Sequence, residues 1–254
     1  MISPSTKTQI NSFYWLSDTK LCIVTNKNIE VVQIFKDSGK SKLLASHNLT
    51  VYWCKYTSNT NTFVISSSPT DNILNLFRFE NNQLVKLPKI EIPRGIRRVY
   101  TPHSAVFDFT FSIKEKTVWL LKLYGVAYVC HLFCINNEDR LILYNVSKSE
   151  KVYVEDAFFI LGSPGESYAV NSIDNLVMVH NMNSQSTSIF DIKSVPSEHG
   201  PSISGLNQSI KGYGTEVEPL PMKCPNSTES LYIPQIRFFQ PNLVIDHRTG
   251  MVKI

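Results

Sequence analysis

The run Glu30-Val-Val-Gln-Ile-Phe35 is the first of four similar segments from which the fold is predicted. Each combines β-branched, aromatic and other large apolar residues, which are typical of strands in a packed sheet. The other three are Asn75-Leu-Phe-Arg-Phe79, Leu141-Ile-Leu-Tyr-Asn-Val146 and Ser188-Ile-Phe-Asp-Ile192. Their aromatic residues Phe35, Phe79, Tyr144 and Phe190 are separated by 44, 65 and 46 residues. The middle gap is longer because it contains the stretch from Pro93 to Pro102, which is interpreted as an inserted loop. The other two gaps give a period of about 45 residues, which is the spacing of β-propeller blades.

Short strand-like runs bounded by Asn, Asp, Ser, Gly and Lys continue this pattern along the chain. We predict strands at Ile10–Leu16, Leu21–Thr25, Ile29–Phe35, Thr50–Tyr56, Thr62–Ser66, Ile73–Phe79, Ala105–Phe111, Thr117–Leu123, Val126–Cys134, Arg140–Val146, Ala157–Leu161, Leu176–His180 and Thr187–Ile192. Turns such as Asn81-Asn82 suit tight hairpins, because Asn tolerates positive φ. The predicted fold class is therefore all-β: a partial β-propeller with WD40-like four-stranded antiparallel blades, incomplete at both ends. A β-sandwich is the alternative.

The predicted domain organisation has three parts. Residues 1–193 form the partial β-propeller, with about four blades that end near 35, 79, 146 and 192. Residues 194–230 are rich in Ser, Pro and Gly, which predicts a loop or disordered insertion. Residues 231–254 begin a further blade. The basic stretch from Pro93 to Pro102 is interpreted as an inserted loop.

Composition limits the function classes. The 254 residues are 43% apolar and 18% charged, with a net charge of +4, which is too small to require a nucleic acid or an anionic membrane. Five cysteines cannot all pair, so a reducing compartment is expected. The apolar run Val118–Ile135 contains Lys122, Gly125 and His131, and is interpreted as two strands hinged at Tyr124-Gly125 rather than a membrane span.

Few residues suggest chemistry. Cys130, His131 and Cys134 lack a second ligand pair for zinc, and Cys130 and Cys134 share one strand face while His131 points to the other. Gly162-Ser-Pro-Gly165 is a turn rather than a nucleophile elbow, and Asp174 and His180 give no specific sign of a triad. Arg94, Arg97 and Arg98 form a basic patch that is interpreted as a solvated loop. We therefore predict no enzyme, with no catalytic, metal-binding or cofactor-binding residues and no cofactor.

Four runs, in this order and spacing, resemble one known family. They are Leu43-Leu-Ala-Ser-His-Asn-Leu-Thr-Val-Tyr-Trp53, Asn72–Phe79 followed by Leu87–Glu91, Asp174–His180 followed by Ser188–Lys193, and Phe239-Gln-Pro-Asn-Leu-Val244. The chain resembles the Mic (Bulli) family, the regulatory third subunit of the Mon–Ccz guanine-nucleotide exchange complex of the late-endosomal Rab. None of these motifs is catalytic, and residues 94–116 depart from the family pattern.

The resemblance implies a non-catalytic scaffold whose partners are the Mon and Ccz longin-domain proteins and, indirectly, the Rab GTPase. It implies a cytoplasmic protein, peripheral on late endosome and lysosome membranes through its partners, with roles in trafficking and autophagy. The Ser-His-Asn-Leu run beginning at Ser46 would be a blade turn with His47 at a strand entry, Asp174-Asn175 would turn into the next strand, and Asp191 would be a hydrogen-bonding residue at a strand end. The partner-binding residues are unknown. The alternative is a generic β-propeller adaptor of a coat, tether or ubiquitin-ligase assembly.

Overall fold

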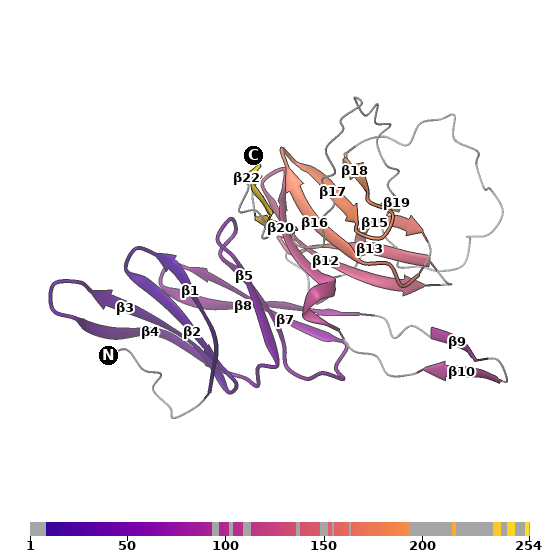
Figure 1. Cartoon of the computed structure of the whole chain (residues 1–254). Coiled ribbons are helices and arrows are strands. Elements are labelled where there is room, and N and C mark those ends of the chain that lie inside the picture. The colour runs from indigo at the N-terminus through magenta and orange to yellow at the C-terminus, as the bar shows by residue number, and fades with distance from the viewer. Residues whose placement is uncertain are drawn as a thin grey trace. The chain divides into compact units, whose positions relative to one another are not determined.

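The computed structural model describes residues 9–92, 97–101, 104–108, 113–135, 138–147, 152–153, 155–162, 164–193, 215–216, 236–239, 243–246 and 252–253. Within these residues the secondary structure is β-strand, apart from one short 3₁₀ turn (Figure 1). The chain divides into two compact units, which are described separately. Unit 1 contains Met1–Leu120 and Val146–Tyr153, and unit 2 contains Leu121–Asn145 and Val154–Ile254.

Two antiparallel sheets build unit 1. The first sheet has the order β1-β2-β3-β4, with β1 at Ile10–Ser17, β2 at Lys20–Thr25, β3 at Asn28–Phe35 and β4 at Lys40–Asn48. The second sheet contains β5 at Trp53–Thr57, β6 at Thr62–Ser66, β7 at Ile73–Glu80 and β8 at Gln83–Glu91, in chain order. β14, at Val152–Tyr153, adds a short parallel strand beside β8.

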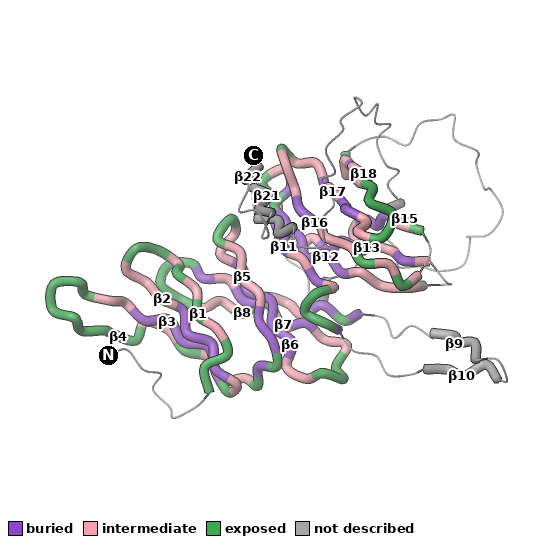
Figure 2. The backbone as a smooth tube through the Cα atoms, viewed as in Figure 1, coloured by how far each residue is buried: buried purple, intermediate pink, exposed green. Residues whose placement is uncertain are grey.

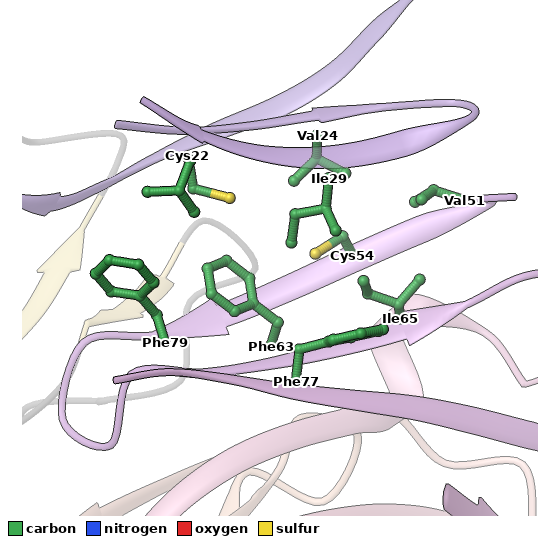
Figure 3. Packing of buried hydrophobic residues seen from close by; sticks show 10 residues of the cluster. Cys22, Val24, Ile29, Val51, Cys54, Phe63, Ile65, Phe77 and Phe79 are labelled. Carbon is green, nitrogen blue, oxygen red and sulfur yellow. The ribbon is translucent and has the colours of Figure 1, made fainter. Parts of the chain in front are cut away.

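The two sheets of unit 1 enclose a shared core (Figure 3). Cys22, Val24 and Ile29 from the first sheet face Phe63 and Phe77 from the second, and all five are fully buried. Because alternate strand residues point to opposite faces, each sheet contributes every second side chain to this core. Burial of large aromatic side chains in such a core supplies much of the free energy of folding.

Side-chain hydrogen bonds fasten the first sheet to the second. The Tyr14 hydroxyl donates to the Cys54 carbonyl at 2.7 Å, and the Asn11 amide donates to the Val51 carbonyl at 3.1 Å. The Tyr14 ring lies 5.3 Å from the Tyr56 ring, centroid to centroid. Burial raises the pKa of the Tyr14 hydroxyl, so it stays protonated and can donate.

After β8 the chain forms a further hairpin. β9, at Arg97–Thr101, pairs antiparallel with β10, at Ser104–Asp108, so the prediction of a loop from Pro93 to Pro102 is wrong for 97–101. The 3₁₀ turn η1 follows at Glu115–Thr117. The Trp53 indole donates to the Ile113 carbonyl at 3.0 Å, and the Lys55 ammonium donates to the Val118 carbonyl at 2.7 Å. These bonds hold the returning chain against β5.

Three sheets lie in unit 2. The largest has the order β11-β12-β13-β15-β19, with β11 at Val118–Leu123, β12 at Val126–Ile135, β13 at Glu138–Asn145, β15 at Glu155–Gly162 and β19 at Thr215–Glu216. The next contains β16 at Tyr168–Ile173, β17 at Leu176–Asn181 and β18 at Ser186–Phe190, and the last contains β20 at Ile236–Phe239, β21 at Leu243–Asp246 and β22 at Val252–Lys253. Phe159 stacks on Phe190 at 4.1 Å, which joins the first two of these sheets.

Two-residue turns with positive φ connect several hairpins. Asn81-Asn82 has φ values of 50° and 62°, Tyr124-Gly125 has 51° and 77°, and Asp174-Asn175 has 47° and 71°. Positive φ at both central residues is the type I′ pattern, whose twist matches that of paired strands. The predicted Tyr124-Gly125 hinge therefore separates two strands, β11 and β12. In the described part of the chain, no helix is long and apolar enough to cross a membrane.

The predicted fold class is confirmed as all-β with WD40-like four-stranded antiparallel sheets. The marker residues Phe35, Phe79 and Tyr144 each lie on the third strand of a different sheet, as does Phe190. Among the strands not predicted from the sequence are β4, β8 and β16. β4 and β16 lie at sheet edges, whereas β8 lies between β7 and the short strand β14. The division of 1–193 into blades, the insertion at 194–230 and the further blade at 231–254 stay predictions, and most of 194–254 lies outside the described residues.

Candidate functional site

Exposed apolar side chains are concentrated on the first sheet. Among the described residues, large hydrophobic side chains are exposed at seven positions, and five of these belong to β1, β3 and β4. We call these five the first-sheet patch: Ile10, Phe13, Trp15, Phe35 and Leu43. Single exposed hydrophobic residues are ordinary, whereas a group on one sheet is typical of an interaction surface.

Strand alternation explains why β1 contributes Phe13 and Trp15. Tyr14 and Leu16 pack against the core between the sheets, so Phe13 and Trp15 point to the opposite face. Their exposed fractions are 65% and 54%. β1 is also an edge strand of its sheet, because only β2 pairs with it among the described strands. This face of β1 therefore offers aromatic side chains beside an unpaired strand edge, a combination that can accept a partner.

A shallow groove of about 560 Å³ adjoins the patch at the β1–β2 turn. Its lining residues are Trp15, Leu16, Ser17, Asp18 and Lys36. A second groove, of about 430 Å³, lies between this turn and the Asn81-Asn82 turn. Both grooves are open to solvent and combine apolar with charged side chains. They suit contact with a surface or a peptide better than enclosure of a small substrate.

A buried polar network supports the same sheet at the β2–β3 turn. The side chains of Thr25, Asn28 and Glu30 are each at most 3% exposed. The Thr25 hydroxyl bonds to the Asn28 side-chain oxygen, and the Asn28 amide donates to Glu30 Oε1 at 2.7 Å. Hydrogen bonds offset the large desolvation penalty of a buried carboxylate. This network was not predicted, because in the sequence Asn28 and Glu30 resemble ordinary residues of a turn and a strand.

The Cys130, His131 and Cys134 cluster lies on β12. Cys130 is fully buried, His131 is 3% exposed, and Cys134 is intermediate. Burial lowers the pKa of His131 to about 3 and raises that of the Cys130 thiol. His131 Nδ1 has no hydrogen-bond partner among the described residues. Nor do the described residues contain a group of three His, Cys, Asp or Glu side chains that could hold a metal ion.

The other chemically suggestive residues occupy structural positions. Both ring nitrogens of His180 are engaged at 2.8 Å, one with Thr187 Oγ1 and one with Asn171 Oδ1. Asp174 lies in the β16–β17 turn. Gly165 donates its backbone N–H to Asp139 Oδ2 at 3.1 Å. The structure thus brings His180 together with neutral neighbours on adjacent strands, which is an arrangement of a packed sheet.

The residues carried by the family resemblance also have definite positions. Ser46 and His47 lie at the end of β4, so the predicted turn from Ser46 with His47 at a strand entry is wrong, and the His47 ring packs 4.7 Å from the Phe77 ring. Asp174-Asn175 does form the turn into β17. Asp191 follows β18 and accepts a 2.5 Å hydrogen bond from the Tyr124 hydroxyl. Arg94 lies outside the described residues, and Arg97 and Arg98 lie on β9, where only the backbone is described.

Tyr124 joins two hairpin turns of unit 2. Its backbone N–H donates to Asn175 Oδ1 at 2.5 Å, and its ring lies 3.9 Å from the Lys193 ammonium. These contacts and the bond to Asp191 hold Tyr124 at a positive φ, which is uncommon for an aromatic residue. The cluster fixes the relation between the β11–β12 turn and the end of β18. Its members come from both sheets that Phe159 and Phe190 also connect.

An all-β chain with a concentrated apolar surface is typical of interaction proteins, and sequence comparison identifies its relatives. The chain is 27% identical over 256 residues to the human "Regulator of MON1-CCZ1 complex", covering 95% of this chain and 37% of that protein. The mouse protein of the same name is 25% identical over 256 residues, which cover 95% of this chain and 37% of that protein. The Dictyostelium discoideum homolog is 22% identical over 230 residues, which cover 90% of this chain and 21% of that protein. The predicted family resemblance is confirmed: this chain is a relative of these regulators.

The chain spans 37% of the length of the two mammalian relatives. No protein-family model matches it. Among solved structures, it is similar to the AfRom2 CNH domain at a TM-score of 0.41 and 9% identity, covering 74% of this chain and 53% of that one. The Sif2 C-terminal WD40 domain has a TM-score of 0.36 and 10% identity, and the match covers 96% of this chain and 71% of that one. The Doa1 WD40 β-propeller domain has a TM-score of 0.36 and 9% identity, and the match covers 98% of this chain and 68% of that one.

Proposed function

We propose that this chain is a non-catalytic regulatory part of a Mon–Ccz guanine-nucleotide exchange complex. The observation that carries the proposal is its relation to named regulators of that complex over 95% of its length. In this role the Mon and Ccz longin-domain proteins carry out the exchange on the late-endosomal Rab, and this chain provides a binding surface. The relatives are named as regulators, which agrees with a subunit that acts by contact rather than by a reaction of its own.

The first sheet supports this role physically. A subunit that acts through protein contact needs an exposed apolar surface on a rigid support. Phe13 provides such a surface, and the adjacent Tyr14 anchors β1 to the second sheet by its 2.7 Å bond to Cys54. We further propose a cytoplasmic location, peripheral on late endosomes and lysosomes, with roles in vesicle trafficking and autophagy and without binding of nucleic acid.

Reconstitution tests the proposal. The purified protein is mixed with purified Mon–Ccz and separated by size-exclusion chromatography, and nucleotide release from the late-endosomal Rab is followed in parallel. We expect co-elution with Mon–Ccz and a change in the exchange rate that depends on Mon–Ccz. If the protein elutes alone and leaves exchange unchanged, the proposal is wrong. Proximity labelling that instead finds coat, tether or ubiquitin-ligase subunits would favour the generic adaptor.

A further inference from the structure

The β3–β4 hairpin extends beyond the rest of its sheet. The Ile34 N–H donates to the Thr19 carbonyl at 2.7 Å, so β3 is still paired at the level of the β1–β2 turn. Residues 35–40 continue past this level, and residues 35–43 are all exposed (Figure 2). Gly39 at the tip has a φ of +63°, which a glycine adopts without strain. The hairpin is therefore a narrow projection with solvent on both faces.

Large apolar side chains are exposed on both faces of this end of the sheet. Trp15 pairs with Leu21, Leu21 with Val32, and Val32 with Leu43, so Trp15 and Leu43 lie in one cross-strand row on the same face. Phe35 is three positions after Val32 and so points to the other face. The exposed fractions are 54% for Trp15, 47% for Phe35 and 48% for Leu43. A flat protein partner covers one face, whereas a bilayer can surround both.

Lysines accompany these apolar side chains. Lys36, Lys40 and Lys42 are exposed, and Asp37 is the one acidic residue between Phe35 and Leu43. Lysine on an edge strand commonly prevents sheet-to-sheet aggregation, which accounts for Lys40 and Lys42 alone. It does not account for exposed Trp15, Phe35 and Leu43 beside them. Lysine is depleted from protein–protein interfaces but is frequent beside Trp, Phe and Leu where a protein lies on an anionic membrane.

We propose that this end of the first sheet, formed by Trp15, Phe35, Leu43, Lys36, Lys40 and Lys42, binds an anionic lipid bilayer directly. Phe35, Leu43 and Trp15 enter the interfacial region, and the three lysines contact acidic headgroups. The aliphatic stems of the lysines can lie along the apolar zone while their ammonium groups reach the phosphate level. This contact is independent of Mon–Ccz binding, which is expected to persist when the hairpin end is altered.

Vesicle sedimentation tests the electrostatic half of the proposal. The probe is phosphatidylcholine vesicles with or without phosphatidylserine, and the variant is K36E/K40E/K42E. The matched control, K27E/K116E/K122E, makes the same change in net charge at three exposed lysines outside the hairpin. Each lysine near an anionic surface contributes to the free energy of membrane binding, so the loss of three lysines weakens binding on the order of 100-fold. We expect this loss in the hairpin variant and a much smaller loss in the control.

Tryptophan fluorescence tests the apolar half. The chain has three tryptophans, Trp15, Trp53 and Trp119, and Trp53 is buried. With vesicles that contain brominated lipid, we expect quenching in the wild type and its loss in W15F. Quenching that persists in W15F, or equal binding to neutral and anionic vesicles, would overturn the proposal. So would a hairpin variant that loses Mon–Ccz while the wild type binds no vesicle, since the surface would then be a protein interface. Circular dichroism establishes that each variant keeps its sheet content.

Discussion

Acid sensitivity of unit 2 should depend on His131. This side chain is 3% exposed on β12, and Nδ1 has no hydrogen-bond partner among the described residues. Burial lowers its pKa from 6.5 to about 3, because a charged imidazolium would be desolvated there. The unfolded chain takes up a proton as pH falls below the ordinary pKa, whereas the folded chain does not. The stability of the folded state is therefore lost as pH falls from 6.5 towards 3.

The size of this effect follows from linkage. Between pH 7 and pH 5 the difference in proton uptake by His131 lowers the free energy of unfolding by about 2 kcal/mol. His180, whose burial lowers its pKa to about 4, adds a loss of similar size. Replacing His131 by Leu removes the titrating group and an unpaired buried nitrogen. The His131→Leu variant should therefore lose about 2 kcal/mol less than the wild type over this pH range.

Urea unfolding at pH 7 and pH 5, followed by circular dichroism, measures this difference directly. Comparing wild type and variant at both pH values cancels the contributions of all other titrating groups. At pH 7 the variant should be as stable as the wild type or more stable, because Nδ1 has no hydrogen bond to lose. Equal losses in the two proteins between pH 7 and pH 5, or strong destabilisation of the variant at pH 7, would show that His131 does not cause the acid sensitivity.

Three further predictions concern the core, a turn and the exposed face of β1. Phe77→Ala should lower the free energy of unfolding by roughly 3–5 kcal/mol in urea titration, because the ring is fully buried between two sheets. Gly125→Ala should cost about 1 kcal/mol in the same assay, since φ is +77° while no atom lies within 4 Å of the added Cβ; an unchanged midpoint would contradict this. Phe13→Ser should weaken co-elution with Mon–Ccz, whereas Tyr52→Ser, at a residue 57% exposed outside the first-sheet patch, should not.

Local chemistry predicted the hairpins well and the edge strands poorly. The pairs Asn81-Asn82 and Asp174-Asn175 indicate type I′ turns, because Asn and Asp tolerate positive φ. β4 begins Lys-Ser-Lys, and β8 contains Pro88, so neither has the apolar composition of a central strand. β4 tolerates such residues because it lies at a sheet edge, where one side of the strand needs no partner, and Pro88 lies where the pairing of β8 with β7 shifts register. Their pairing comes from the neighbouring strand, which the residues themselves do not encode.

The exposed surface was harder to predict from sequence. In β1 the consecutive residues Phe13, Tyr14, Trp15 and Leu16 are all apolar or aromatic, so composition does not distinguish the two faces. Contact with the second sheet decides it, since that sheet receives Tyr14 and Leu16. Nor could the sequence distinguish the neutral hydrogen-bonded setting of His180 from a catalytic one. That distinction required Thr187 and Asn171 on the neighbouring strands.

A binding titration measures whether this chain contacts Mon–Ccz directly, as the proposed regulation requires. Purified Mon–Ccz is titrated with the labelled protein, and the dissociation constant is read from fluorescence anisotropy. We expect saturable binding that Phe13→Ser weakens and Tyr52→Ser leaves intact. No saturable binding by folded protein, up to concentrations at which unrelated propeller domains associate non-specifically, would contradict it.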